Sequence, residues 1–211
     1  ILFLILPASA LLIVLRFQIV RVALGTGRFG PEDVLLTARV LAIFSVSLFA
    51  EALTLLFLRG FFAWEDTKTP FFMGLIATVF RVGLMWYLSG KYGIIGLAFG
   101  FTAGGILHFV ALAFALGQKL KKRFKGISLN ELKTFIFMVK VTSASLAAAA
   151  SAYFSLRIFD NLINISGVLN AFLTGGLAGL VGIAIYCFSA IILNIENSSI
   201  DHFKQKISKW I

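Results

Sequence analysis

The chain has 211 residues, 60% of them hydrophobic, and a mean hydropathy of +0.99. Soluble domains are about 45–50% apolar, whereas this chain holds apolar runs long enough for the roughly 20 residues that cross a bilayer. These values exclude a soluble domain and predict a protein embedded in the phospholipid bilayer. The net charge of +10 does not indicate a nucleic-acid partner, because its densest basic run, KLKKRFK at 119–125, directly follows an apolar run.

The apolar runs predict an all-α integral membrane fold. They are continuous rather than alternating, which favours helices over the strands of a barrel. The first run has no methionine and lacks the charged start and cleavage site of a signal peptide, so we expect an N-terminal part of the protein to lie outside this sequence. The six expected spans are 1–15, 34–58, 71–89, 94–117, 134–156 and 167–193.

Basic residues are distributed unevenly between the two sets of loops. The segments 59–70, 118–133 and 194–211 hold eleven Lys and Arg, and the opposite loops hold five. Because cytoplasmic loops carry the excess of positive charge, the first set is predicted to be cytoplasmic. The protein is therefore expected to be a multi-pass protein of the bacterial cytoplasmic membrane with a cytoplasmic C-terminus.

The last segment, 196–211, differs from the spans. Its apolar residues recur every three or four positions, with lysines between them, which predicts a short amphipathic helix on the cytoplasmic leaflet. A frayed polar tail is the alternative, and the helix is favoured because a tryptophan anchors well at an interface. The apolar positions are Ile200, Phe203, Ile207 and Trp210.

A polar hinge, RGFFAWEDTKTP at 59–70, separates the second and third spans. Proline suits the first turn of a helix, and Asp and Thr are good N-caps. Arg and Lys in this segment can meet anionic lipid headgroups. We expect a device that ends one span and starts the next, in preference to direct substrate contact. The hinge residues are Arg59, Asp66, Thr67, Lys68, Thr69 and Pro70.

Two stripes of small residues at four-residue spacing predict close helix packing. Sliding of the packed helices is a possible additional role that the sequence does not separate from packing. The stripes consist of Gly96, Gly100 and Gly104 in the fourth span, and of Ala171, Gly175 and Gly179 in the sixth.

Four charged residues lie inside the predicted spans and are the candidates for a substrate cavity. Arg81 lies eleven residues after Pro70, about 16 Å into its helix, and Glu51 lies about 12 Å from the same side. Such charges are costly in lipid and face a bundle interior or water, so an Arg81–Glu51 pair is expected. Arg39 and Lys140 lie near span ends, where snorkelling is favoured over function.

The sequence offers no constellation for covalent chemistry. Cys187 has no partner cysteine, and His108 is far from the second histidine, so neither a disulfide nor a metal site is predicted. His108 is expected to be packed or hydrogen-bonded. We therefore expect no cofactor and no enzymatic activity, and the polar residues at depth favour transport through the membrane.

An ordered series of motifs carries a family resemblance. Leu6–Pro7–Ala8 is followed by Gly27–Arg28–Phe29 with Glu32 shortly after, then by Arg59–Gly60–Phe61–Phe62–Ala63 and by Asp66–Thr67–Lys68–Thr69–Pro70. The series closely resembles the MurJ/MviN family of lipid II flippases, in the multidrug/oligosaccharidyl-lipid/polysaccharide exporter superfamily. The resemblance is good over 6–70, moderate over 71–123 and weak beyond.

The resemblance implies the C-terminal half of a fourteen-span protein whose two lobes surround a central cavity. Residues 1–123 would be spans nine to twelve, 124–195 spans thirteen and fourteen with a groove for a lipid tail, and 196–211 the tail. The partner of this half would be the N-terminal lobe of the same protein. The implied cargo is lipid II or another undecaprenyl-linked glycolipid. Alternatives are a related polysaccharide-lipid or multidrug exporter, and a non-transporting membrane scaffold.

The resemblance also bears on sodium. Some family members bind this ion through an Asn and an acidic residue on span eleven and a Thr on span twelve. The two span-eleven positions here are Arg81 and Met85, which cannot bind a cation, and Thr102 matches the threonine. We therefore expect no metal site, and we interpret Thr102 as a weak remnant of the sodium site.

Overall fold

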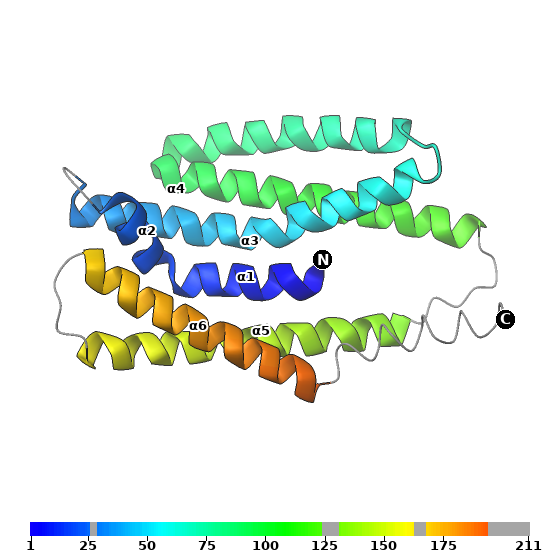
Figure 1. Ribbon diagram of the computed structural model, residues 1–211. Coiled ribbons are helices and arrows are strands. Elements are labelled where there is room, and N and C mark those ends of the chain that lie inside the picture. The colour runs from blue at the N-terminus through cyan, green and yellow to red at the C-terminus, as the bar shows by residue number, and fades with distance from the viewer. Residues whose placement is uncertain (26–28, 124–130, 163–167, 194–211) are drawn as a thin grey trace. The chain divides into compact units, whose positions relative to one another are not determined.

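The computed structural model describes residues 1–25, 29–123, 131–162 and 168–193 (Figure 1). Within these ranges the chain is helical and contains no strand, which confirms the predicted all-α fold. The predicted amphipathic tail, 196–211, lies outside the described residues. The helices are α1 Leu2–Val14, α2 Arg16–Leu24, α3 Pro31–Phe62, α4 Lys68–Arg123, α5 Glu131–Leu162 and α6 Val168–Ile192.

The chain forms two compact units. Unit 1 comprises Ile1–Ile5 and Leu24–Ile127 and contains α3 and α4, whereas unit 2 comprises Leu6–Ala23 and Ser128–Ile211 and contains α5 and α6. Most of α1 and all of α2 except Leu24 belong to unit 2. Glycines of α6 leave room for them there, since Gly175, Gly179 and Gly182 face Gln18, Leu15 and Leu11.

Helix α4 is a hairpin with two limbs. At Gly93 the backbone has φ of 60° and ψ of −139°, a conformation that glycine adopts readily because it has no Cβ. The second limb, 94–123, folds back along the first limb, 68–92 (Figure 1). The two limbs correspond to the third and fourth predicted spans.

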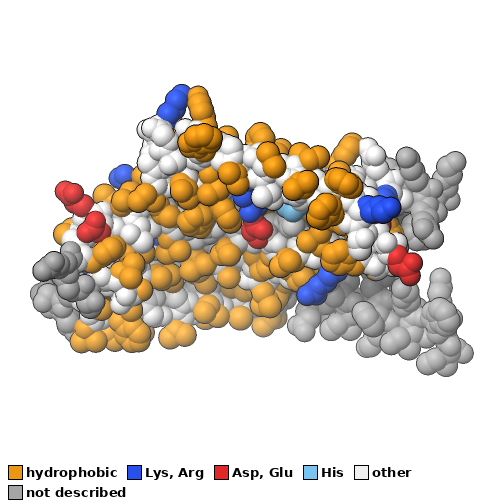
Figure 2. All heavy atoms as spheres, turned by 90° about the horizontal axis from the view of Figure 1, so that it is seen from above, with side chains coloured by type: hydrophobic (Ala, Val, Ile, Leu, Met, Phe, Trp, Pro, Cys, Tyr) orange, Lys and Arg blue, Asp and Glu red, His pale blue; other side chains and the backbone are white. Residues whose placement is uncertain are grey.

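The helices have the length and composition needed to cross a membrane. Four of the described helices, α3 to α6, meet both criteria, and α1 with α2 forms a fifth candidate bent by 72°. Figure 2 shows hydrophobic side chains over most of the visible face. Trp86, for example, is 83% exposed. Such a surface would promote aggregation in water, but it suits contact with lipid. The protein is a multi-pass membrane protein.

The first predicted span ends in a break that the apolar run alone did not predict. Helix α1 ends at Val14, and α2 begins at Arg16 after a bend of 72°. The guanidinium Nη1 of Arg16 donates a hydrogen bond of 2.6 Å to the carbonyl oxygen of Ile13. A cation is favourable at this place because the last carbonyl groups of a helix carry partial negative charge.

Candidate functional site

The charged pair expected inside the helices is formed in unit 1. Arg81, on the first limb of α4, places Nη2 2.7 Å from Oε1 of Glu51 on α3. The Arg81 side chain is 20% exposed and that of Glu51 is 38% exposed. The guanidinium also lies 4.6 Å from the ring centre of Phe101, on the second limb. One cation therefore contacts all three helical segments of the unit, through a carboxylate and an aromatic face.

Two adjacent glycines provide the space for this pair. A Cβ on Gly105 would lie 2.9 Å from both Arg81 Nη2 and Glu51 Oε1. A Cβ on Gly104 would lie 2.7 Å from the Cβ and Cγ of Arg81. Gly104 belongs to the predicted small-residue stripe, but Gly105 does not and was missed. The only sign of Gly105 in the sequence is that it directly follows Gly104, a member of the stripe.

His108 lies on the same limb, three residues after Gly105. Its Nε2 is buried and has no hydrogen-bond partner among the described residues. A Cβ on Gly74 would lie 3.7 Å from this nitrogen, so the imidazole packs against the first limb. His108 is therefore packed between the two limbs of α4, as expected, and its Nε2 forms no hydrogen bond with a described residue.

Of the other two cavity candidates, Arg39 lies in the same unit but far from the pair, and Lys140 belongs to unit 2. Arg39 is exposed on α3, twelve residues before Glu51, which is about 18 Å along the helix. Lys140, in unit 2, donates a hydrogen bond of 2.9 Å from Nζ to the carbonyl oxygen of Leu193, just after α6. Lys140 therefore caps the C-terminal end of α6, a position that favours a cation.

Thr102, the expected remnant of a sodium site, is used in helix packing. It is 7% exposed, and Oγ1 donates a 3.2 Å hydrogen bond to the carbonyl oxygen of Ile43 on α3. Among the described residues, no three His, Cys, Asp or Glu side chains lie close enough to hold a metal ion. The hydroxyl thus links α3 to the second limb of α4.

The polar hinge ends α3 with a motif of paired backbone hydrogen bonds. The N–H of Asp66 donates to the carbonyl of Phe61, and the N–H of Glu65 donates to that of Phe62. This is the Schellman pattern, in which the residue before the last donor takes a left-handed conformation. Glu65 fills that position with φ of 57°, although glycine is the usual residue there. No motif in the sequence indicated this strain.

The same hinge starts α4. Oδ1 of Asp66 accepts a 3.1 Å hydrogen bond from the N–H of Thr69, so Asp66 caps the helix. Oδ2 of Asp66 forms an ion pair with Nζ of Lys119, near the end of the second limb. Nζ of Lys119 also lies 5.4 Å from the ring centre of the fully buried Phe61. Asp66 therefore joins the ends of α3 and both limbs.

Most of the small-residue stripes lie at close helix contacts. A Cβ on Gly100 would lie 2.7 Å from backbone atoms of Met85, and one on Gly96 would overlap the carbonyl oxygen of Leu88. In unit 2, a Cβ on Gly175 would lie 2.7 Å from Cβ of Gln18. Gly179 is less constrained, with Leu15 at 3.3 Å. Gly96 and Gly100 of the first stripe therefore face backbone, whereas Gly104 and the glycines of the second stripe face side chains.

Comparisons with known proteins agree with the motif series. The family model described as "Lipid II flippase MurJ" matches residues 1–173. A probable lipid II flippase MurJ of Rhizobium meliloti is 29% identical over 208 residues, which is 99% of this chain and 38% of that protein. The probable lipid II flippase MurJ of Thermotoga maritima is 32% identical over 128 residues, covering 61% of this chain and 27% of its own length.

A solved structure supports the same fold. "Lipid II flippase MurJ, inward closed conformation" matches 90% of this chain and 36% of its own, with a TM-score of 0.67 and 22% sequence identity. The chain thus spans less than two fifths of the length of these relatives. Because the family model covers most of the chain, this protein belongs to the MurJ family of lipid II flippases.

Proposed function

We propose that this chain is part of a flippase that moves lipid II from the cytoplasmic to the outer leaflet of the bacterial cytoplasmic membrane by alternating access. The observation that carries the proposal is the family match over residues 1–173. Helices long enough to cross the membrane, with a charged pair between them, support a transport role. The step moves a lipid without making or breaking a covalent bond, so the protein acts as a transporter and not as an enzyme.

In this proposal the Arg81–Glu51 pair lies in the transport cavity, and Glu51 stays paired with Arg81 until the cargo binds. Removing a lone guanidinium from water is costly, and a neighbouring carboxylate offsets that cost. A guanidinium has five N–H donors, and the bond to Glu51 uses one of them. Arg81 can therefore bind a phosphate oxygen of the cargo while Glu51, which is the more exposed partner, turns toward water.

The function can be tested in a bacterium depleted of its own lipid II flippase. The full-length protein that carries this chain should restore growth and the amount of lipid II in the outer leaflet, and Arg81→Gln should reduce the latter. Export of another undecaprenyl-linked glycolipid without lipid II would instead favour the related exporter. Normal localisation with neither activity would favour a scaffold and would contradict the proposal.

The orientation is proposed from the charge distribution. In a Cys187→Ala background, a cysteine replacing Lys91 should react with an impermeant reagent added to intact cells, and one replacing Lys122 should not. The reverse labelling would overturn the cytoplasmic C-terminus. Transport is also expected to be insensitive to sodium, since a guanidinium lies where a cation would bind. A sodium-dependent rate that Thr102→Ala abolishes would show that the cation site persists.

A further inference from the structure

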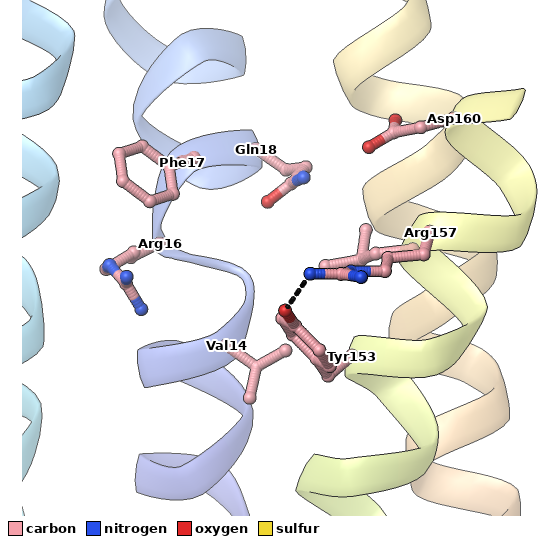
Figure 3. Close-up of a pocket in the computed structure, with 8 residues that line it drawn as sticks. Val14, Arg16, Phe17, Gln18, Tyr153, Arg157 and Asp160 are labelled. Atoms are coloured by element: carbon pink, nitrogen blue, oxygen red, sulfur yellow. Dashed lines mark hydrogen bonds between the residues drawn. The ribbon is translucent and has the colours of Figure 1, made fainter.

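Unit 2 contains a small cavity that the flippase proposal does not use. Its volume is about 230 Å³, and it lies between the break that separates α1 from α2 and the last turns of α5 (Figure 3). Pockets for drug-sized ligands span roughly 300–1,000 Å³, so this one suits a smaller group. The lining residues used below are Val14, Gln18, Tyr153, Leu156, Arg157 and Asp160.

The cavity contains a positioned cation. Nη2 of Arg157 donates a 2.8 Å hydrogen bond to the hydroxyl of Tyr153, and the guanidinium lies 5.2 Å from the centre of that ring. Arg157 forms no ion pair with a described residue, and four of its five N–H donors are available. A guanidinium fixed in this way is suited to a phosphate group.

The cavity also contains acceptors. Asp160, three residues after Arg157 on α5, is exposed and pairs with no described basic residue. Oε1 of Gln18, on α2, is buried without a described hydrogen-bond partner. Figure 3 shows both side chains directed into the space beside Arg157. A carboxylate and an amide oxygen together can accept hydrogen bonds from a primary ammonium group.

Arg16, the second arginine that lines the cavity, does not add a positive charge beside Arg157 and Asp160. Arg16 donates to the carbonyl oxygen of Ile13, and its guanidinium lies 4.6 Å from the ring centre of Phe17. Figure 3 shows both side chains directed away from Arg157. Among the lining side chains that Figure 3 shows directed into the cavity, Arg157 is the cation and Asp160 is the anion, and the two form no ion pair.

The position of the cavity indicates a lipid. Arg157 and Asp160 lie in the last two turns of α5, Glu131–Leu162, at one end of its apolar span, so we place the charged groups near the membrane surface. That is the level at which lipid headgroups lie. Val14 and Leu156 also line the cavity and provide apolar contact for the part of the lipid next to its headgroup.

We propose that this cavity binds the headgroup of a zwitterionic phospholipid with a primary amine, such as phosphatidylethanolamine. Arg157 binds the phosphate, and Asp160 with Gln18 accepts hydrogen bonds from the ammonium. A purely anionic headgroup would place negative charge beside Asp160, and a choline headgroup has no N–H to donate. The site lies within unit 2, and the proposal does not depend on the proposed function.

The proposal can be tested by native mass spectrometry of the purified full-length protein. The protein is mixed with equal amounts of phosphatidylethanolamine, phosphatidylglycerol and phosphatidylcholine that share the same acyl chains. Retention of the ethanolamine lipid should exceed that of each other lipid by about tenfold, which corresponds to about 1.4 kcal/mol. Arg157→Gln should remove most of this retention, and Asp160→Asn should remove the preference over phosphatidylglycerol.

Lys91→Gln is the matched control. Nζ of Lys91 donates a 2.8 Å hydrogen bond to the hydroxyl of Tyr87, also four residues earlier, but Lys91 lines no part of this cavity. This variant should retain the ethanolamine lipid at the wild-type level. Equal retention of the three lipids by the wild type, or an unchanged preference in Asp160→Asn, would overturn the proposal. Retention of free phosphoethanolamine as tight as that of the lipid would overturn the lipid as the source of the headgroup.

Discussion

The two compact units bury their helix pairs with different kinds of side chain. Between α3 and α4 lie the Arg81–Glu51 pair and aromatic contacts such as Phe44 on Phe101, with ring centres 5.3 Å apart. Between α5 and α6 the described core consists of small or aliphatic residues with one tyrosine. Its members are Val141, Ala144, Ala148, Tyr186 and Ala190.

The hydrogen bonds of the two units differ less. Hydroxyls in both units donate to carbonyls four residues earlier in their own helices, as Ser45 and Thr54 do in unit 1 and Ser145 and Thr174 do in unit 2. Such local bonds satisfy a hydroxyl but do not join helices. Each unit also has a bond between elements, from Thr102 to the carbonyl of Ile43 in unit 1 and from Lys140 to that of Leu193 in unit 2. The units therefore differ chiefly in their interiors, since unit 1 holds a partly exposed ion pair between its helices and unit 2 holds an apolar core.

The largest effect should come from filling a close contact between a glycine and the backbone of the facing limb. Gly100→Ala places a Cβ 2.7 Å from the backbone of Met85, which cannot yield, and should destabilise the protein by about 3 kcal/mol. Gly182→Ala in unit 2 has its nearest contact, at 2.7 Å, with the end of the Leu11 side chain, and should cost about 1 kcal/mol. Unfolding in detergent would measure both.

Gly83 gives the control, because a Cβ there has nothing within 4 Å. Gly83→Ala should be neutral or stabilising by up to about 1 kcal/mol, through helix propensity alone. A loss in Gly182→Ala as large as that in Gly100→Ala would contradict the difference between backbone and side-chain contacts in the two units.

The second effect concerns the charged pair. Arg81→Gln and Glu51→Gln should each destabilise by about 2 kcal/mol, which is typical of losing a hydrogen bond to a charged group. The value stays below the 3–5 kcal/mol of a fully buried pair because both side chains are partly exposed. The double variant should be less destabilised than the sum of the two, by more than about 1 kcal/mol.

Lys140→Met is the comparison in unit 2. It removes one hydrogen bond to the carbonyl of Leu193 and should cost about 1 kcal/mol, without coupling to Glu51→Gln. Additive losses in the Arg81–Glu51 cycle would show that the two charges do not stabilise each other.

Much of this arrangement could be predicted from the sequence. Run lengths predicted the helices, and helical rise placed Arg81 and Glu51 at similar depth on consecutive spans that had to be antiparallel. Gly105 could not be identified in this way, since its importance comes from the position of Arg81 across the hairpin. The left-handed Glu65 could not be predicted either, because the sequence has no glycine at that place.

The break after α1 is a second feature that could not be predicted in full from the sequence. Residues 1–15 read as one apolar run, and the bend follows only where Arg16 and Gln18 interrupt it. The cavity at the break depends on Tyr153 and Arg157, more than a hundred residues later, so no local pattern could indicate it.

A third, smaller effect is expected at the hinge. Asp66→Ala removes the cap of α4 and the ion pair with Lys119, and should destabilise by about 1.5 kcal/mol. Asp66→Asn keeps a capping oxygen and should cost about 0.5 kcal/mol, the value of a weak surface ion pair. Thermal unfolding would separate the two contributions. Equal losses would show that the ion pair, and not the cap, holds the hinge.

The smallest effect should come from Glu65, the residue that closes the α3–α4 turn. A left-handed conformation costs a non-glycine residue about 1–2 kcal/mol, whereas glycine loses about 0.5–1 kcal/mol more backbone entropy on folding. Glu65→Gly should therefore stabilise unit 1 by about 0.5 kcal/mol, and Glu65→Val should destabilise it, because a β-branched residue tolerates positive φ poorly. Melting temperatures of the two variants would check the sign. If Glu65→Gly stabilises the protein and also slows the proposed lipid II transport, the strain at this turn contributes to that transport. If Glu65→Gly stabilises the protein with no change in transport, the strain has no part in transport. The two units then differ only in the side chains of their interiors.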